Sequence, residues 1–296
     1  MTSIVEKIGS GRVLISDGAW GTALQQRGLK AGACPELWNI EHRDSVLAVA
    51  RAYVEAGSDL IQANSFGASR LKLAHFGLAP RAAEINRAAA EISREAAGAE
   101  RNVIASVGPT GKILIMGDVS ESQLYDAFAE QMIALESGGA DACCIETFAA
   151  LDEACLAIRA ARENTRLEII CTFTFEQTRR GDYRTMMGVS PTDMTATVVA
   201  AGAKIVGSNC GNGMERMEHI AAEIRAAHAD IPILIHANAG MPVRVDGVDT
   251  FPETPAMMAE KTLTVIEAGA NIVGGCCGST PAHIRAIRQA LDAAQA

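Results

Sequence analysis

Basic tracts, aromatic residues and long apolar runs are all scarce in this chain. Aromatic residues account for 4% of the 296 residues, and the formal net charge is −9. Nucleic acids and anionic membrane surfaces are bound through clustered lysine and arginine, so neither is an expected partner. No apolar run approaches the length of a membrane span, and residues 1–12 hold no apolar segment of signal-peptide length. A cytoplasmic protein with a sizeable core is therefore expected.

A regular disulfide framework is absent as well. The eight cysteines show no repeating spacing, and disulfides are not expected in a reducing compartment. Metal binding, catalysis and plain burial are the competing interpretations of these thiols. The cysteines are Cys34, Cys143, Cys144, Cys155, Cys171, Cys210, Cys276 and Cys277.

Short apolar runs alternate with longer alanine-rich segments from one end of the chain to the other. Near-continuous apolar character is typical of parallel strands that helices cover on the outside. The sequence predicts eight strands, at 13–18, 59–66, 102–108, 142–148, 168–175, 204–211, 232–240 and 271–278.

Apolar residues at helical spacing fill most of the intervals between these strands. Examples of the predicted helices are 44–55, 82–97, 121–137, 151–162, 214–227, 256–268 and 281–293. Ser190-Pro191 and Thr280-Pro281 each place a capping hydroxyl before a proline, which suits the start of a helix.

Eight βα units in a chain of this length predict an α/β fold, a (β/α)8 TIM barrel. A doubly wound sheet is the alternative, since alternation alone does not distinguish a closed sheet from an open one. Polar residues end nearly all eight strands, whereas an open sheet concentrates its ligands at one switch point, and this favours the barrel. Only one helix follows the last strand, so we expect a single domain over residues 1–296.

Three cysteines stand where an apolar run ends in glycine: Cys210 in GSNCG, and Cys276 and Cys277 in GGCCG. Glycine lets the backbone bend at a strand end, so consecutive cysteines there can reach the same ion. One strand separates the two sites, a gap of roughly 10 Å that side chains can mostly bridge. Three thiolates leave one position of a tetrahedral zinc ion open. The alternatives are plain burial, predicted for the mid-strand pair Cys143-Cys144, or a vicinal disulfide.

These elements resemble the homocysteine S-methyltransferase family, which includes a module of cobalamin-dependent methionine synthase and betaine–homocysteine methyltransferase. The resemblance covers essentially the whole chain, through DGAWGT, YVEAGSDLIQANSFGAS, GPTG, IETF, GSNCG, HANAG and GGCCGSTPAHI. It implies a (β/α)8 barrel and one zinc ion held by Cys210, Cys276 and Cys277, with the substrate thiol as fourth ligand. A free thiol with a pKa of about 8.5 is mostly protonated at neutral pH, and zinc removes that proton.

The amino-acid end of the substrate is expected at the ends of the first and fourth strands. Asp17, Gly18 and Thr22 lie in DGAWGT, and Glu146 lies in IETF. A carboxylate accepts hydrogen bonds from an α-ammonium group, while backbone N–H groups near a helix start suit an α-carboxylate. The resemblance implies homocysteine-binding roles for Asp17, Gly18 and Glu146. Asp17 could equally cap a turn or a helix, whereas Glu146 ends an apolar strand and needs a partner.

Several further residues have two interpretations each. Asn64 and Asn238 end strands, where they could contact substrate, orient a metal ligand or satisfy loop backbone. His236 shares its strand face with Asn238 and is expected to be a hydrogen-bonded core histidine rather than a ligand. Trp20 and Trp38 could form a cation–π wall for a methylated cation, although packing against the barrel rim is the simpler interpretation.

The sequence therefore predicts a zinc-dependent methyltransferase that converts L-homocysteine into L-methionine, with Cys210, Cys276, Cys277 and Glu146 as its catalytic residues. The metal takes the place of a general base. The expected methyl donor is a small onium compound or a corrinoid on a separate protein, and the charged segment 176–191 could dock either one. A catabolic demethylase with the same zinc–thiolate chemistry and a non-catalytic structural-zinc barrel are the alternatives.

Overall fold

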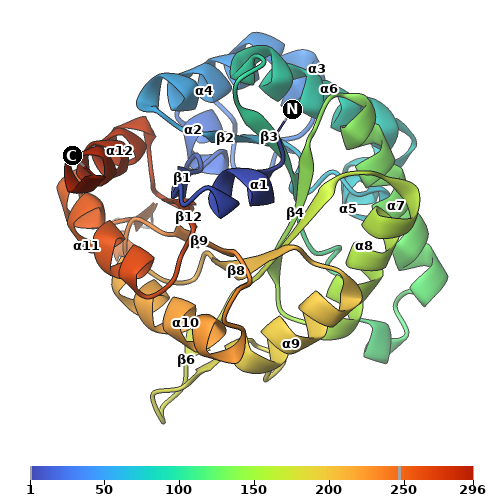
Figure 1. Ribbon diagram of the computed structural model, residues 1–296. Helices are drawn as coiled ribbons and strands as arrows, with labels where there is room; N and C mark the ends of the chain where they lie inside the picture. Colours follow the sequence, from blue (N-terminus) through green and yellow to red (C-terminus); the bar gives the residue numbers. More distant parts are fainter. Residues whose placement is uncertain (1, 246–247, 296) are drawn as a thin grey trace.

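Eight parallel strands form the wall of a barrel, seen end-on in Figure 1. The computed structural model describes residues 2–245 and 248–295. The strands pair in the order β1-β12-β9-β8-β5-β4-β3-β2, which follows the chain around the barrel, so the (β/α)8 prediction is confirmed and the doubly wound alternative is excluded. The strands are β1 (Leu14–Ile15), β2 (Leu60–Ala63), β3 (Asn102–Val107), β4 (Ala142–Phe148), β5 (Glu168–Phe173), β8 (Ile205–Asn209), β9 (Ile233–Ala237) and β12 (Ile272–Gly275).

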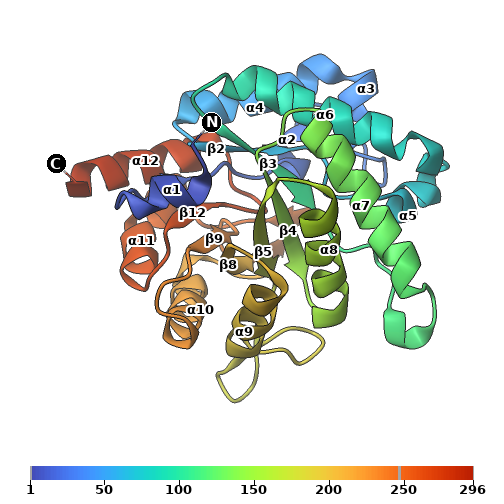
Figure 2. The same ribbon diagram turned by 45° about the vertical axis from the view of Figure 1, so that its right-hand side comes forward.

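A ring of helices encloses the strands, as the turned view in Figure 2 shows. The main helices are α4 (Arg43–Ala56), α6 (Ala82–Ala97), α7 (Glu121–Ser137), α8 (Leu151–Asn164), α9 (Pro191–Ala201), α10 (Met214–Ala227), α11 (Pro255–Glu267) and α12 (Pro281–Gln295). The predicted start of α9 at Ser190-Pro191 is confirmed, since Ser190 accepts a hydrogen bond from the Asp193 N–H at 3.0 Å. Within the described ranges, no helix combines the length and apolarity needed to cross a membrane.

Shorter helices, turns and hairpins lie before and between these main elements. They are α1 (Ile4–Gly9), α2 (Gly21–Gln25), α3 (Trp38–Glu41), α5 (Arg70–Leu73), three 3-10 turns (Ala74–Phe76, Ala79–Arg81 and Leu114–Met116) and the hairpins β6–β7 (Glu176–Gln177 with Tyr183–Arg184) and β10–β11 (Val243–Val245 with Val248–Thr250). The segment 176–191, predicted as a loop, thus contains a hairpin, which projects beyond the helix ring in Figure 1.

The barrel interior is apolar at one end and polar above it. Every strand contributes at least one side chain to a buried apolar layer, which Ile4 of α1 covers, and α1 crosses this end of the barrel in Figure 1. Alternation along a strand returns a side chain to the interior two residues later. The residues at those positions are Ser16, Gln62, Ser106, Glu146, Thr172, Gly207, His236 and Gly274. Polar groups above an apolar floor therefore form the base of the candidate site.

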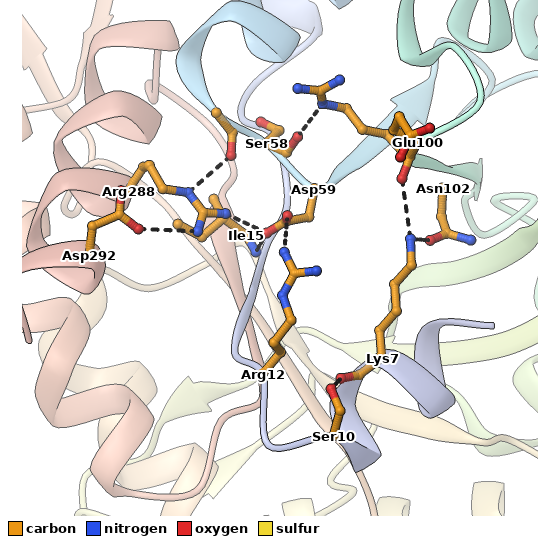
Figure 3. A network of polar contacts seen from close by, with 12 residues as sticks. Lys7, Ser10, Arg12, Ile15, Ser58, Asp59, Glu100, Asn102, Arg288 and Asp292 are labelled. Carbon is orange, nitrogen blue, oxygen red and sulfur yellow. Dashed lines mark hydrogen bonds and ion pairs between the residues drawn. The ribbon is translucent and has the colours of Figure 1, made fainter. Parts of the chain in front are cut away.

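The seam between β1 and β2 is held in part by a side chain. The Asp59 carboxylate accepts the Ile15 N–H at 2.9 Å, and the Asp59 N–H donates to the Ile15 carbonyl at 2.6 Å. Arg12 (3.0 Å) and Arg288 of α12 also converge on Asp59, as Figure 3 shows. The two arginines offset the charge of this half-buried carboxylate, which connects β1, the shortest strand of the barrel, to the start of β2.

Candidate metal and substrate site

The three cysteines at the glycine-framed strand ends lie together on the barrel rim. The Sγ atoms of Cys210, Cys276 and Cys277 are all within 4.8 Å of one another, and those of Cys210 and Cys277 are 3.7 Å apart. Zn–S bonds of about 2.3 Å in tetrahedral geometry place sulfurs about 3.8 Å apart. The three sulfurs therefore fit a zinc ion, and within the described residues they are the one such group of three or more candidate ligands.

The strand between the two cysteine sites holds both in place. The Cys210 N–H donates to the His236 carbonyl at 3.0 Å, and the Cys276 N–H donates to the Ala237 carbonyl at 2.7 Å, both on β9. Cys210 adopts a positive φ of 60°, which turns the chain at the end of β8. A Cβ on Gly275 would lie 2.1 Å from the Ser279 hydroxyl oxygen, so a side chain there would displace this turn. Backbone hydrogen bonds thus bridge the gap predicted from strand spacing.

Hydrogen bonds among the three rim thiols shift their pKa values. Hydrogen bonds from Cys276 and Cys277 lower the pKa of Cys210, and the Asn238 amide adds to this effect. The hydrogen bonds that Cys276 and Cys277 make to Cys210 raise the pKa values of both thiols above the ordinary thiol range. The group therefore holds its first negative charge readily and its second and third only with difficulty. A dication placed among the sulfurs would remove that difficulty.

All eight cysteines are free thiols, so the Cys276-Cys277 pair does not form the vicinal disulfide considered above. Cys143 and Cys144 lie fully buried in β4, on opposite faces of the barrel wall, and burial raises both pKa values. Their packing role is confirmed by these positions. Glycine framing at a strand end, rather than cysteine pairing itself, separates the rim thiols from the core thiols.

Glu146 lies on the wall of the same cavity, on β4. Its carboxylate accepts a hydrogen bond from the Ser106 hydroxyl and two from the Gln62 amide, at 3.1 and 3.2 Å. Burial raises the pKa of Glu146 to about 7, although the bonds from Ser106 and Gln62 oppose that shift. A buried carboxylate with polar donors but no cation is suited to accept a cationic group of a ligand.

Asp17 lies outside the cavity lining and accepts hydrogen bonds from two residues that line it. Its Oδ2 accepts the Gln62 N–H at 2.8 Å and the Trp20 Nε1–H at 2.9 Å, and the side chain is fully buried. Burial raises the pKa of Asp17 to about 7. The carboxylate thus completes the β1–β2 seam and orients Trp20, whereas Gly18 and Thr22 of the same loop line the cavity.

A cavity of about 490 Å³ opens between these groups. The sequence-predicted residues on its wall are Gly18, Trp20, Thr22, Asn64, Glu146, Cys210, His236, Cys276 and Cys277. Asp17, Trp38 and Asn238 lie outside the lining. Gln62, Ser106, Thr147 and Asn209 also line it, and the sequence analysis did not select them. For Gln62 and Ser106 the available signal was a polar residue two positions after an apolar strand residue.

The remaining candidates from the sequence are Asn64, Trp38 and His236, and their contacts differ. Asn64 donates to the Pro35 carbonyl at 2.8 Å and to the Asn39 side chain at 2.9 Å, so its amide holds the adjoining loop. Trp38 packs on His42, with ring centroids 4.4 Å apart. Burial lowers the pKa of His236 to about 4, and its Nε2 has no hydrogen-bond partner among the described residues, which differs from the hydrogen-bonded core histidine that was expected.

Fold and site together define a (β/α)8 barrel with three neighbouring thiols on its rim, spaced as zinc ligands are. The sequence pattern of the homocysteine S-methyltransferase family matches residues 14–291. Methionine synthase of Mycobacterium tuberculosis is 33% identical over 95% of this chain, which spans 25% of that relative. Betaine–homocysteine S-methyltransferase 1 of rat is 28% identical over 97% of the chain and 74% of that relative. The chain belongs to the homocysteine S-methyltransferase family.

A solved structure shares the fold. The metallated form of the homocysteine methyltransferase MmuM from Escherichia coli superposes with a TM-score of 0.79 at 22% identity. The match covers 96% of this chain and 98% of the other. The chain spans about a quarter of the methionine synthases that it matches.

Replacing one rim sulfur tests the metal site. We expect Cys210→Ala to weaken zinc affinity by more than about a hundredfold, because the two remaining sulfurs cannot complete the site. The control Cys155→Ala removes a half-buried thiol on α8 and should keep its zinc. Zinc content after dialysis against a competing chelator measures both variants. A Cys210→Ala protein with full zinc content would show that these sulfurs do not bind the metal.

Proposed function

We propose that this chain is a zinc-dependent S-methyltransferase that moves a methyl group onto the thiol of L-homocysteine and yields L-methionine. One observation carries the proposal: a single cavity of about 490 Å³ is lined by three rim thiols and by a buried carboxylate. These are the two kinds of group that an amino acid with a terminal thiol requires. Family membership supports the same substrate. The whole span 1–296 acts as one methyl-transfer unit, because strands spread over it supply the site.

Different side chains would bind the two ends of the substrate, its thiol and its amino-acid group. Cys210, Cys276 and Cys277 would hold Zn²⁺, which when bound supplies the charge that keeps a substrate thiol deprotonated at neutral pH. Glu146 accepts the α-ammonium group, and Ser106 and Gln62 hold its carboxylate in place. Gly18 and Thr22 border the cavity where the α-carboxylate would lie, and Asn64, Asn238 and Asp17 support this arrangement through the contacts described above.

The charge of the cavity wall favours a cationic methyl donor. Glu36 and Glu146 line the cavity, and among its described lining residues there is no lysine or arginine. Trp20 and Phe66 add aromatic faces, which attract quaternary ammonium and sulfonium groups. We therefore propose that the methyl donor is a small onium compound and not a methylcorrinoid on a separate protein. The reducing cytoplasm is the proposed location, since neighbouring free thiols persist there.

A donor screen tests this function. Zinc-loaded protein with homocysteine should form methionine from a sulfonium or quaternary ammonium donor, and removal of zinc should abolish the product until zinc is restored. Methionine is measured by mass spectrometry. Turnover with a methylcorrinoid protein alone would contradict the choice of donor. No methionine from any donor would contradict the methyltransferase function itself.

Acidification should weaken homocysteine binding through Glu146. With a pKa of about 7, this carboxyl group is ionised above that pH and protonated below it, and only the ionised form pairs with an ammonium group. From about pH 8 to about pH 6 the ionised fraction falls about tenfold, so the dissociation constant should rise by about that factor. Glu146→Gln lacks this dependence and retains whatever arises from thiol deprotonation. Calorimetric titrations of both proteins that give parallel pH profiles would contradict the assignment.

A further inference from the structure

Two residues that line the cavity have strained backbone conformations. Thr147 and Cys210 are the non-glycine residues with positive φ in the described part of the chain, at 65° and 60°. The left-handed region is unfavourable for a β-branched residue such as threonine, so surrounding contacts must hold Thr147 there. Thr147 directly follows Glu146, and the pairing of β4 with β5 shifts register between Ile145 and Phe148.

The side chain of Asn209 supplies those contacts. Its Oδ1 accepts the Thr147 N–H at 2.8 Å, and its Nδ2 donates to the Thr147 hydroxyl at 2.7 Å. Because a backbone N–H can only donate, the orientation of the amide is fixed. Asn209 is 1% exposed and directly precedes Cys210. One side chain therefore joins the residue after Glu146 to the residue before a rim cysteine.

This connection crosses a strand. Asn209 lies on β8 and Thr147 on β4, with β5 between them. Thr172 of β5 donates its hydroxyl to Asn209 Oδ1 at 2.7 Å, and Thr174, which directly follows β5, donates its hydroxyl to the Asn209 carbonyl at 2.8 Å. Both the side chain and the backbone of Asn209 are thus held by its neighbours. The Asn209 amide therefore cannot shift without losing three hydrogen bonds, one buried and two partly buried.

We propose that Asn209 and Thr147 are positioning residues that fix the separation between the Glu146 carboxylate and the rim sulfurs. This inference rests on the proposed function, in which one ligand occupies both places at once. A ligand that has a thiol and an ammonium group gains from a fixed separation, because its second contact forms without further ordering of the protein. A ligand with a thiol alone gains nothing from it.

The variant Thr147→Gly removes the hydroxyl and also the backbone strain, since glycine adopts positive φ freely, so folding should be preserved. Thr147→Ser keeps the hydroxyl, so this variant should behave like the wild type. Thr262→Val is the matched control, because Thr262 is a fully buried threonine on α11 whose hydroxyl donates to the Met258 carbonyl at 2.8 Å.

Thiol binding to Co²⁺-substituted protein, followed by the thiolate-to-cobalt absorption band, is the test. In Thr147→Gly the dissociation constant for homocysteine should rise by about tenfold or more, while that for 2-mercaptoethanol stays within about twofold. Thr147→Ser and Thr262→Val should match the wild type with both ligands, and all variants should bind cobalt fully.

Two results would overturn the inference. Homocysteine affinity in Thr147→Gly could stay within about twofold of the wild type, or both thiols could weaken equally, which would assign Thr147 to the metal site alone. A wild-type protein that binds homocysteine no better than 2-mercaptoethanol would instead contradict the proposed function, so the two failures are distinguishable.

Discussion

The hydrogen bonds that tie both cysteine loops to β9 are the constraint on which the site depends. They hold Cys210 and Cys276 on either side of one strand and bring three sulfurs to a separation that suits one zinc ion. The apolar floor below, covered by Ile4, keeps the strands in register. A change that moved β8 away from β12 would therefore also move the sulfurs apart.

The ionisable groups that line the cavity are mainly acidic. Three thiols and the carboxylates of Glu36 and Glu146 line it, and its described lining residues include no basic side chain. Buried negative charge without a partner is unfavourable, and the raised pKa of Glu146 expresses this. In our proposal, positive charge arrives with the ligands: a metal ion at the sulfurs, an ammonium group at Glu146 and an onium donor beside Trp20.

The sequence predicted the barrel because each strand is a near-continuous apolar run and most helices carry apolar residues at helical spacing. Helix α9 was predicted from its capping serine and proline rather than from apolar spacing, since threonine and valine in PTDMTATVVAA lower helix propensity. The three rim cysteines could be found because glycine marks the ends of their strands. Asp17 and Asn209 could not be interpreted in the same way. Their roles depend on partners across the β1–β2 seam or across β5, which no local pattern reveals.

The central claim is that the three sulfurs leave one position on the metal for the thiol of the substrate. X-ray absorption at the zinc edge, recorded with and without homocysteine, tests it most directly. We expect three protein sulfurs in the first shell of the free protein and one additional sulfur when homocysteine is present. A first shell that already contains four protein ligands and does not change with homocysteine would contradict the account.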